Sequence, residues 1–266
     1  MIRAASPPNG GQLLREWRLR RNLSQLDVAL GAAVSARHLS FIETGRARPS
    51  REMVLHLADR LEVPLRERNR LLMAAGHAPQ FAEHDLEAEE MAPVREALER
   101  FLAAHEPYPA VIVDRHWTLV LRNRAADVLT DGVAPDLLEP PANALRVAFH
   151  PNGMAPRIAN FSEFSARALR RVRRQIAMTG DPALERLYEE LAGYPGVKPA
   201  RGVAEAPGAW DIVEPIRLRR GDGELTLFST LAVFGTALDI TLAELTIEAF
   251  YPGDPETARA LAAQAG

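Results

Sequence analysis

The stretch LSQLDVALGAAVSARHLSFIETGRARP, residues Leu23–Pro49, predicts two short helices joined by a tight turn. Ser24 and Ser35 each stand one residue before a run with apolar residues at helical spacing, which is where a helix N-cap is expected. Between the two runs only the small residues Gly31, Ala32 and Ala33 are available for the corner. We interpret this stretch as a helix-turn-helix whose second helix covers about residues 36–43.

The apolar residues of the two runs are expected to form the buried sides of the pair. They are Leu26, Ala29 and Leu30 in the first run, and Val34, Leu39 and Ile42 in the second. Three further helices are predicted around the pair: Gly11–Arg21 before it, one that Ser50 caps and that continues to Leu61, and one that begins at Pro64 and ends before Gly76.

This region resembles the phage-repressor-like (XRE, lambda-repressor-like) DNA-binding domains. The matching residues are Gln25, Ala29, Val34-Ser35, Leu39, Ile42 and Glu43-Thr44-Gly45. One position departs from the family, because the turn residue that is usually glycine is Ala33 here. A left-handed backbone at alanine costs about 1 kcal/mol, which a helical bundle tolerates.

The resemblance implies that the second helix lies in the major groove of double-stranded DNA. We expect Arg37 to make a bidentate contact to guanine, although contact with phosphate alone is an equal alternative. Two roles are possible for Phe41: its ring packs on a thymine methyl, or it folds back into the core of the domain. Gln25 and Ser24, at a helix N-terminus, are expected to hold a phosphate. The arginines that follow the second helix are expected to contact the next stretch of the DNA backbone. The predicted DNA-binding residues are Ser24, Gln25, Ser35, Ala36, Arg37, His38, Ser40, Phe41, Arg46, Arg48 and Arg51.

The charge of the chain is unevenly distributed. Residues 1–80 hold 13 arginines and 7 acidic residues, a net of +6, whereas the whole chain has a net charge of -3. A basic first third joined to an acidic remainder is typical of a nucleic-acid-binding module linked to a domain that avoids phosphate. The 266 residues are enough for two domains.

The absence of cysteine excludes disulfides, thiolate metal sites and a cysteine nucleophile. No run of about 18 apolar residues and no signal-peptide pattern is present, so we expect a cytoplasmic protein without a membrane partner. The segment from Gly76 to Pro93 is polar, acidic and interrupted by proline, which predicts a linker. The expected domains are 1–78 for the helix-turn-helix, 79–93 for the linker and 94–266 for a second domain.

The second domain opens with a predicted helix from Val94, followed by the apolar strands PAVIVD and WTLVLR, which turn through Asp114-Arg115-His116. A helical piece that Asn123 opens follows directly, an order that resembles the start of a PAS domain. Two long helices, Asn160–Met178 and Ala183–Leu191, precede three more strands, Glu214–Arg219, Glu224–Phe234 and Leu242–Tyr251. The predicted fold class is α+β: an all-α five-helix repressor-like domain, then a PAS-like five-stranded antiparallel sheet with helices on one face.

The order of pieces along nearly the whole chain resembles the MmyB-like transcription regulators. The residues that carry this resemblance are SARHLSFIETGRARPSREM, HEPYPAVIVDRHWTLVLRN, LRVAFHPNG, IANFSE and STLAVFGTALDITLAELTIEAFYP. The family implies a DNA-binding regulator whose PAS-like domain holds a small, largely apolar ligand, with fatty-acid-like molecules as leading candidates.

A ligand with a carboxylate needs a cation or several donors beside an apolar cavity. The candidate ligand-binding residues are Asn123, Arg146, Phe149, His150, Asn160, Phe164, Phe228 and Phe234. For Asn123 and Asn160, capping a helix is the simpler role. The arginines at positions 167, 170, 171, 173 and 174 are expected to form a solvated helix face.

No spacing in the chain points to catalysis, since HExxH, GxSxG, P-loop and strand-linked GxGxxG motifs are all missing. We therefore expect a transcription regulator that is not an enzyme and has no cofactor beyond a non-covalent apolar ligand. It is expected to bind a pseudo-palindromic operator as a homodimer. Two alternatives stay open: a second domain that only binds protein partners, or a haem-binding PAS sensor that uses a histidine such as His150.

Overall fold

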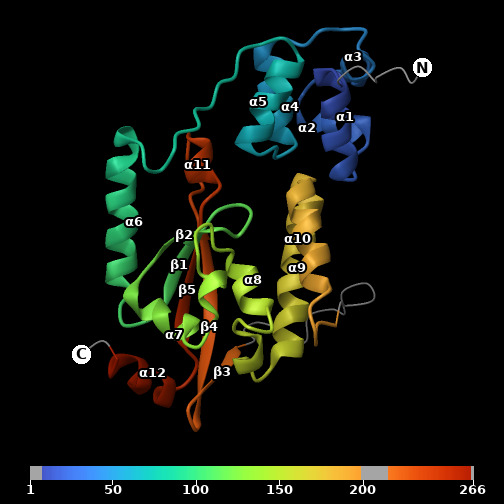
Figure 1. Ribbon diagram of the computed structural model, residues 1–266. Helices are drawn as coiled ribbons and strands as arrows, with labels where there is room; N and C mark the ends of the chain where they lie inside the picture. The colour runs from blue at the N-terminus through green and yellow to red at the C-terminus, as the bar shows by residue number, and fades with distance from the viewer. Residues whose placement is uncertain (1–7, 199–214, 265–266) are drawn as a thin grey trace. The chain divides into compact units, whose positions relative to one another are not determined.

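The computed structural model describes residues 8–198 and 215–264, which form two compact units (Figure 1). The first unit runs up to Glu83 and also takes in the short segments Ala177–Thr179 and Thr236–Ala243. The second unit consists of His84–Ile176, Gly180–Gly235 and Glu244–Gly266. The division after Glu83 falls inside the predicted linker. In the described part of the chain, no helix has the length and apolar character needed to cross a membrane.

The first unit contains the five predicted helices. They are α1 (Gly10–Arg20), α2 (Gln25–Gly31), α3 (Ala36–Glu43), α4 (Arg51–Arg60) and α5 (Leu65–Ala74). Ser24, Ser35 and Ser50 are the N-caps of α2, α3 and α4, and each side chain accepts a hydrogen bond from the N–H three residues later.

The corner between α2 and α3 has the geometry that the sequence predicts. Ala33 has a left-handed backbone with φ of 52°, so this alanine occupies the position where glycine is strain-free. The N–H of Ala33 donates to Leu30 O and that of Val34 to Ala29 O, which satisfies carbonyls at the end of α2.

The expected buried face of α2 was wrong in two of its three positions. Leu26 and Leu30 are 58% and 73% exposed, whereas Val28 and Ala29 are buried. The helix has only seven residues, and Val28, Ala29 and the following Ala32 are enough to supply its buried side, so Leu26 and Leu30 stay on the outer side. The expected buried residues of α3, Leu39 and Ile42, do lie in the core, with Val34 packed beside it.

The beginning of the predicted linker is held by α5. The Asn69 side chain accepts from the N–H groups of Gln80 and Phe81 and donates to Phe81 O at 2.8 Å. Further along, Leu86 and Met91 are buried in the second unit. The segment is therefore a structured connection.

The second unit is a five-stranded antiparallel sheet with the order β2-β1-β5-β4-β3. Its strands are β1 (Ala110–Val113), β2 (Leu119–Arg122), β3 (Ile216–Arg220), β4 (Gly223–Val233) and β5 (Thr246–Pro252). Its longer helices are α6 (Ala92–Ala104), α9 (Phe161–Thr179) and α10 (Pro182–Ala192). Its shorter elements are η1 (Glu89–Met91), η2 (Arg124–Ala126), α7 (Asp127–Thr130), η3 (Pro135–Leu137), α8 (Ala144–Phe149), η4 (Ala155–Arg157) and α12 (Pro255–Ala262).

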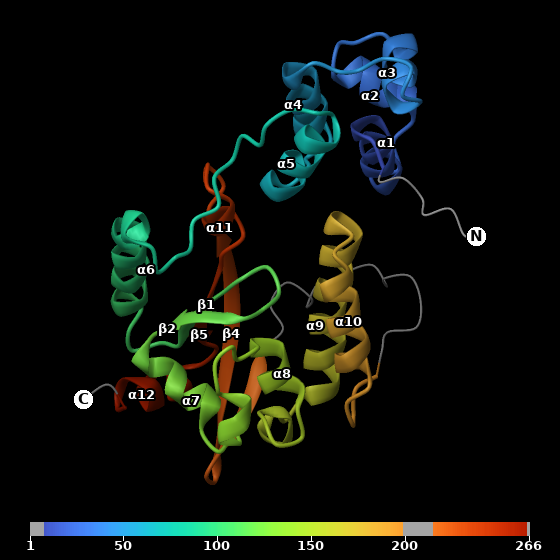
Figure 2. The same cartoon turned by 45° about the horizontal axis from the view of Figure 1, so that its top comes forward.

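Helices lie on both sides of this sheet, which corrects the expectation of one covered face. Figures 1 and 2 show α8, α9 and α10 on one side and α6 on the other. All four residues of β1 are buried, and successive side chains of a strand point to opposite faces. Val111 and Val113 belong to the core that includes α8–α10, so Ala110 and Ile112 lie on the α6 side.

The third C-terminal strand begins later than predicted. Residues Ile240–Ala243 form the short helix α11, and β5 starts only at Thr246. The N–H of Ile240 donates to Ala82 O, so α11 belongs to the first unit by its contacts. The predicted start of another strand, Glu214, lies outside the described residues.

Asn123 closes the sheet onto the helix that follows β2. Its Oδ1 accepts from the N–H groups of Ala110 and Ala126, and its Nδ2 donates to Tyr108 O and Leu102 O. The side chain is buried with its hydrogen-bonding capacity used by backbone groups of four residues.

We expect Asn123→Ala to lower the free energy of unfolding of the second unit by about 3 kcal/mol, because buried backbone groups lose their partners. The measurement is urea unfolding of a chain in which Trp117 is the only tryptophan, Trp17 and Trp210 having been replaced by Phe. Asn152→Ala, at an exposed position, is the control and should change stability by less than about 0.5 kcal/mol. Equal effects of the two substitutions would contradict this role of Asn123.

Candidate functional site

The helix α3 presents the predicted DNA-binding residues in two groups. Arg37 and His38 are exposed near its start, and Ala36, Ser40 and Phe41 are half-buried. Leu39, Ile42 and Glu43 face inward. The exposed residues are those that a helix lying in a major groove brings to base edges.

Phe41 lies beside Arg37 on the surface of α3. The guanidinium carbon of Arg37 is 5.4 Å from the centroid of the Phe41 ring, one turn away. Among the described residues, the side chains packed on the core of the first unit, the DNA-binding headpiece, do not include Phe41. Of the two open roles, this placement favours the outer surface of α3, where the half-buried Phe41 ring lies beside Arg37.

Gln25 is attached to the buried end of α3. Its side-chain amide donates to Glu43 Oε2 at 2.7 Å, and Arg18 donates to both oxygens of Glu43 at 2.7 and 2.8 Å. The hydrogen bond that Arg18 donates to Glu43 is the main cause that raises the pKa of Arg18. One amide proton of Gln25 is taken by Glu43, which leaves one for the predicted phosphate contact.

Ser24 and Ser35 both use their hydroxyl oxygens as helix caps. Ser24 accepts from Asp27 N while Asp27 accepts from Ser24 N, a reciprocal capping arrangement. Ser35 accepts from His38 N. The Ser35 hydroxyl keeps its proton as a donor, which is the group that a phosphate oxygen needs. The Ser24 side chain is also hydrogen-bonded to the Asp27 carboxylate, which lowers the pKa of Asp27.

The three arginines after α3 differ in their surroundings. Arg48 donates to the carbonyls of Ala75 and Gly76, and Arg51 donates to Ala78 O and Gln80 Oε1. Both therefore brace the end of α5 and the segment after it. Arg46 and Arg48 are both exposed, but Arg48 is held by its bonds to two carbonyls, which leaves Arg46 the best placed of the three to meet a phosphate.

The second unit contains an apolar cavity of about 100 Å³ inside its helix-covered core. Strands β1, β2, β3 and β5 and helices α8 and α9 provide most of its wall. The lining residues are Val111, Trp117, Leu119, Arg122, Ala126, Leu129, Thr130, Leu138, Ala142, Ala144, Leu145, Val147, Ala148, Met154, Phe164, Ala168, Arg171, Ile216, Glu248 and Phe250. Apolar walls of this kind favour an apolar ligand, because burial gains about 25 cal/mol per Å² of apolar surface.

Trp117 is the strained residue of the cavity wall. It is buried, and its φ of 68° is a genuine outlier for a bulky side chain. Its indole N–H donates to Gln175 Oε1 at 2.9 Å, which fixes the ring against α9. Strain of this kind costs about 1–3 kcal/mol and gathers at binding sites.

Of the eight predicted ligand-binding residues, only Phe164 lines this cavity. Arg146 pairs with Glu190 at 2.8 Å, and Asn160 bonds the backbone of Pro215 and Arg217 at the start of β3. The hydrogen bond from Arg146 lowers the pKa of Glu190. Asn160 precedes α9 without capping it, which differs from the simpler role expected for it.

The other aromatic candidates lie in different surroundings. Phe149 is fully buried against Phe164, and Phe228 stacks on Tyr251 at 5.3 Å. His150 lies edge-on to Tyr194 and accepts from Asn152 N. Neither His150 nor Phe234 belongs to the wall of the cavity. Because sequence proximity to apolar runs selected these residues, it could not distinguish filled core from cavity wall.

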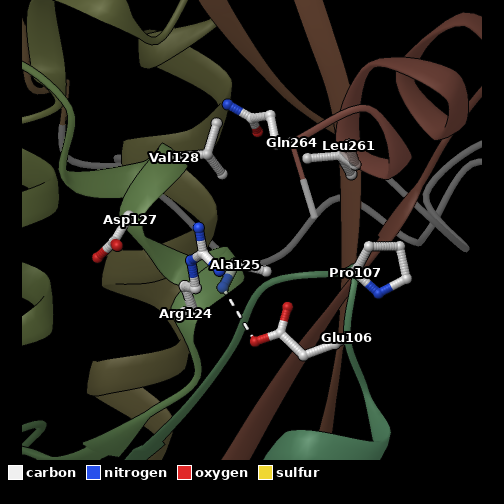
Figure 3. A pocket seen from close by; sticks show the side chains of 8 residues that line it. All are labelled: Glu106, Pro107, Arg124, Ala125, Asp127, Val128, Leu261 and Gln264. Carbon is white, nitrogen blue, oxygen red and sulfur yellow. Dashed lines mark hydrogen bonds between the residues drawn. The ribbon is translucent and has the colours of Figure 1, made fainter. Parts of the chain in front are cut away.

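A larger hollow of about 400 Å³ lies at the edge of the second unit, between the end of α6, η2 and α12. Figure 3 shows its lining, with the carboxylate of Glu106 accepting from Ala125 N. Arg124, Asp127 and Gln264 add charged and polar groups to the wall. This mixed lining does not match a largely apolar ligand.

Among the cavity-wall residues that were not predicted from the sequence are the charged residues Arg171 and Glu248. Arg171 was assigned to a solvated face of α9, yet it follows Phe164 and Ala168 at the spacing i, i+4, i+7, which places all three on one side of the helix. That spacing could have placed Arg171 on the cavity side of α9. No sequence pattern indicates that Glu248 on β5 lines the cavity. Within 8–198 and 215–264, no group of three or more His, Asp or Glu side chains is arranged to hold a metal ion.

Two family models match the chain. One, described as the MmyB-like transcription regulator ligand binding domain, matches residues 94–263, and one described as a helix-turn-helix domain matches residues 11–71. No curated protein matches.

Among solved structures, one entitled "Structure of an RNA-binding Light-Oxygen-Voltage Receptor" is similar to this chain at 15% identity and a TM-score of 0.29. The alignment covers 98% of this chain and 62% of that one, so this chain spans less than two thirds of its length.

Arg37 and Arg46 are expected to affect DNA binding in different ways. Arg37→Ala should cost about 1–3 kcal/mol on the preferred sequence and relax base preference, because a base contact is lost. Arg46→Ala should weaken binding to all sequences and lower the salt slope by about one. Selection from a random duplex library, followed by titration at several salt concentrations, measures both.

The control is Arg70→Ala, which removes the same charge from the exposed side of α5. It should leave both sequence preference and salt slope near those of the unmodified chain. An unchanged base preference in the Arg37 variant would show that this residue does not read bases.

Proposed function

The chain belongs to the MmyB-like transcription regulators, and we propose that it is a DNA-binding regulator controlled by a small, largely apolar, fatty-acid-like ligand in its second unit. The observation that carries the proposal is the apolar cavity, which lies within the residues matched by the ligand-binding family model. A basic helix-turn-helix unit with exposed Arg37 supports the DNA-binding half.

The volume of the cavity limits the size of the ligand that it can hold. A cavity of about 150 Å³ is enough for benzene, so about 100 Å³ takes only a short chain. A longer chain needs the cavity to widen, or it must extend beyond the wall. We therefore propose a carboxylic acid with a short apolar body as the form that the observed cavity accommodates.

Coupling between ligand and DNA requires two arrangements that the ligand binds with different affinity. The path of the chain supports such coupling: it leaves β4, contributes Thr236–Ala243 to the first unit and returns as β5. β5 carries Glu248 and Phe250 of the cavity wall. We propose that ligand occupancy acts on the headpiece through this strand.

We expect the purified full chain to retain a small acid that native mass spectrometry detects and denaturation releases. A chain freed of it should be stabilised by added short carboxylic acids, by about 2.7 kcal/mol at a concentration of 100 times Kd. Ala168→Leu, which fills the cavity, should abolish this shift. Ala103→Leu, at an exposed position of α6, should preserve it.

No retained molecule and no stabilisation by acids of four to ten carbons would contradict the ligand-sensing proposal. That result would favour the alternative in which the second unit only binds protein partners.

The regulator is proposed to act as a homodimer on a pseudo-palindromic operator, because one recognition helix reads only a half-site. Native mass spectrometry should find two chains on a duplex with two half-sites about 10 base pairs apart, and much weaker binding to one half-site. A monomer that binds a single half-site with full affinity would contradict the dimer.

A further inference from the structure

Arg171 differs from the neighbouring arginines of α9. Arg170, Arg173 and Arg174 are exposed, whereas the side chain of Arg171 is 27% exposed and lines the apolar cavity. Its guanidinium carbon lies 4.9 Å from the centroid of the Trp117 ring. The strained tryptophan and the arginine therefore form one wall of the cavity together.

The guanidinium of Arg171 is incompletely paired. Nη1 is buried and has no hydrogen-bond partner in the described part of the chain. Its nearest opposite charge is Glu248 Oε1 at 3.5 Å, an ion-pair distance without a hydrogen bond. A buried donor without a partner costs about 1–3 kcal/mol, more when it is charged, so this site favours any anion that supplies the missing bond.

Glu248 already has another partner. Its Oε1 accepts from the Ser229 hydroxyl at 2.8 Å, across the β4–β5 pair. Its carboxylate is therefore held to the sheet at a distance from Arg171 that leaves the arginine unsatisfied.

The cavity wall contains one other cation, Arg122. Its side chain is 42% exposed, and its guanidinium pairs with Asp127. Solvent and Asp127 already satisfy it, so it has less to gain from a ligand than Arg171.

We infer that Arg171 recognises the carboxylate of a monoanionic ligand whose apolar body fills the cavity, and that Glu248 is an internal carboxylate that weakens this binding. The inference rests on the proposed function and names the head group that the same cavity selects. A carboxylate matches the guanidinium with two parallel hydrogen bonds. A phosphate fits less well, because a second negative charge would face Glu248 next to a single cation.

The experiment compares hexanoate with hexan-1-ol, which has the same apolar chain and no charge, by calorimetric titration of the ligand-free full chain. The unmodified chain should bind hexanoate at least tenfold more tightly. Arg171→Gln should remove this preference while changing hexan-1-ol affinity by less than about threefold. Arg170→Gln, the neighbouring exposed arginine, should retain the preference.

A second variant tests the inference from the opposite direction. Glu248→Gln keeps the size of the side chain and should strengthen hexanoate binding several-fold without changing hexan-1-ol binding, because the competing charge is removed. This gain cannot come from a folding defect.

A hexanoate preference that survives in Arg171→Gln, or that is lost in Arg122→Gln instead, would overturn the inference and leave the proposed function standing. Failure of the unmodified chain to bind either probe would contradict both.

Discussion

The headpiece depends on the buried ion pair between Arg18 of α1 and Glu43 of α3, joined by two hydrogen bonds of 2.7 and 2.8 Å. Removing one partner of such a pair typically costs about 3–5 kcal/mol, because the other charge is left buried. The pair also receives the amide of Gln25, so one carboxylate connects three helices. Together with the buried side chains of Leu39 and Ile42, this pair anchors the inner side of α3, while Arg37 and His38 stay exposed on its outer side.

The second unit contains both a fully paired and an incompletely paired buried polar side chain. Asn123 satisfies buried backbone groups of four residues, whereas Arg171 keeps a buried nitrogen without a hydrogen-bond partner among the described residues. The first arrangement closes the sheet onto the following helix. The second leaves a charged donor beside an apolar cavity whose wall also contains a tryptophan at positive φ. Full pairing is typical of a structural residue such as Asn123, and the incomplete pairing of Arg171 agrees with its proposed role in binding a ligand.

Interactions between neighbouring residues made the helix caps and the turn between α2 and α3 predictable from the sequence. Ser24, Ser35 and Ser50 cap helices because their side chains satisfy N–H groups within three residues. Ala33 adopts the left-handed backbone that the resemblance to the repressor-like domains implied for this turn position. The site was less predictable: Arg146 and His150 lie near apolar runs in sequence, yet the cavity is lined by Arg171 and Glu248, which are 77 residues apart. Only sheet pairing and the packing of α9 bring those two together.

The sequence by itself determined the helix-turn-helix, the five strands, the family and the basic character of the first unit, because caps, periodicity and charge are properties of neighbouring residues. Only the tertiary structure decided that Leu26 and Leu30 are exposed, that α6 covers the second face of the sheet, and which arginine faces the cavity. Each of these depends on which elements pack together. A pattern along one helix shows that a face exists, and the neighbouring elements decide what that face meets.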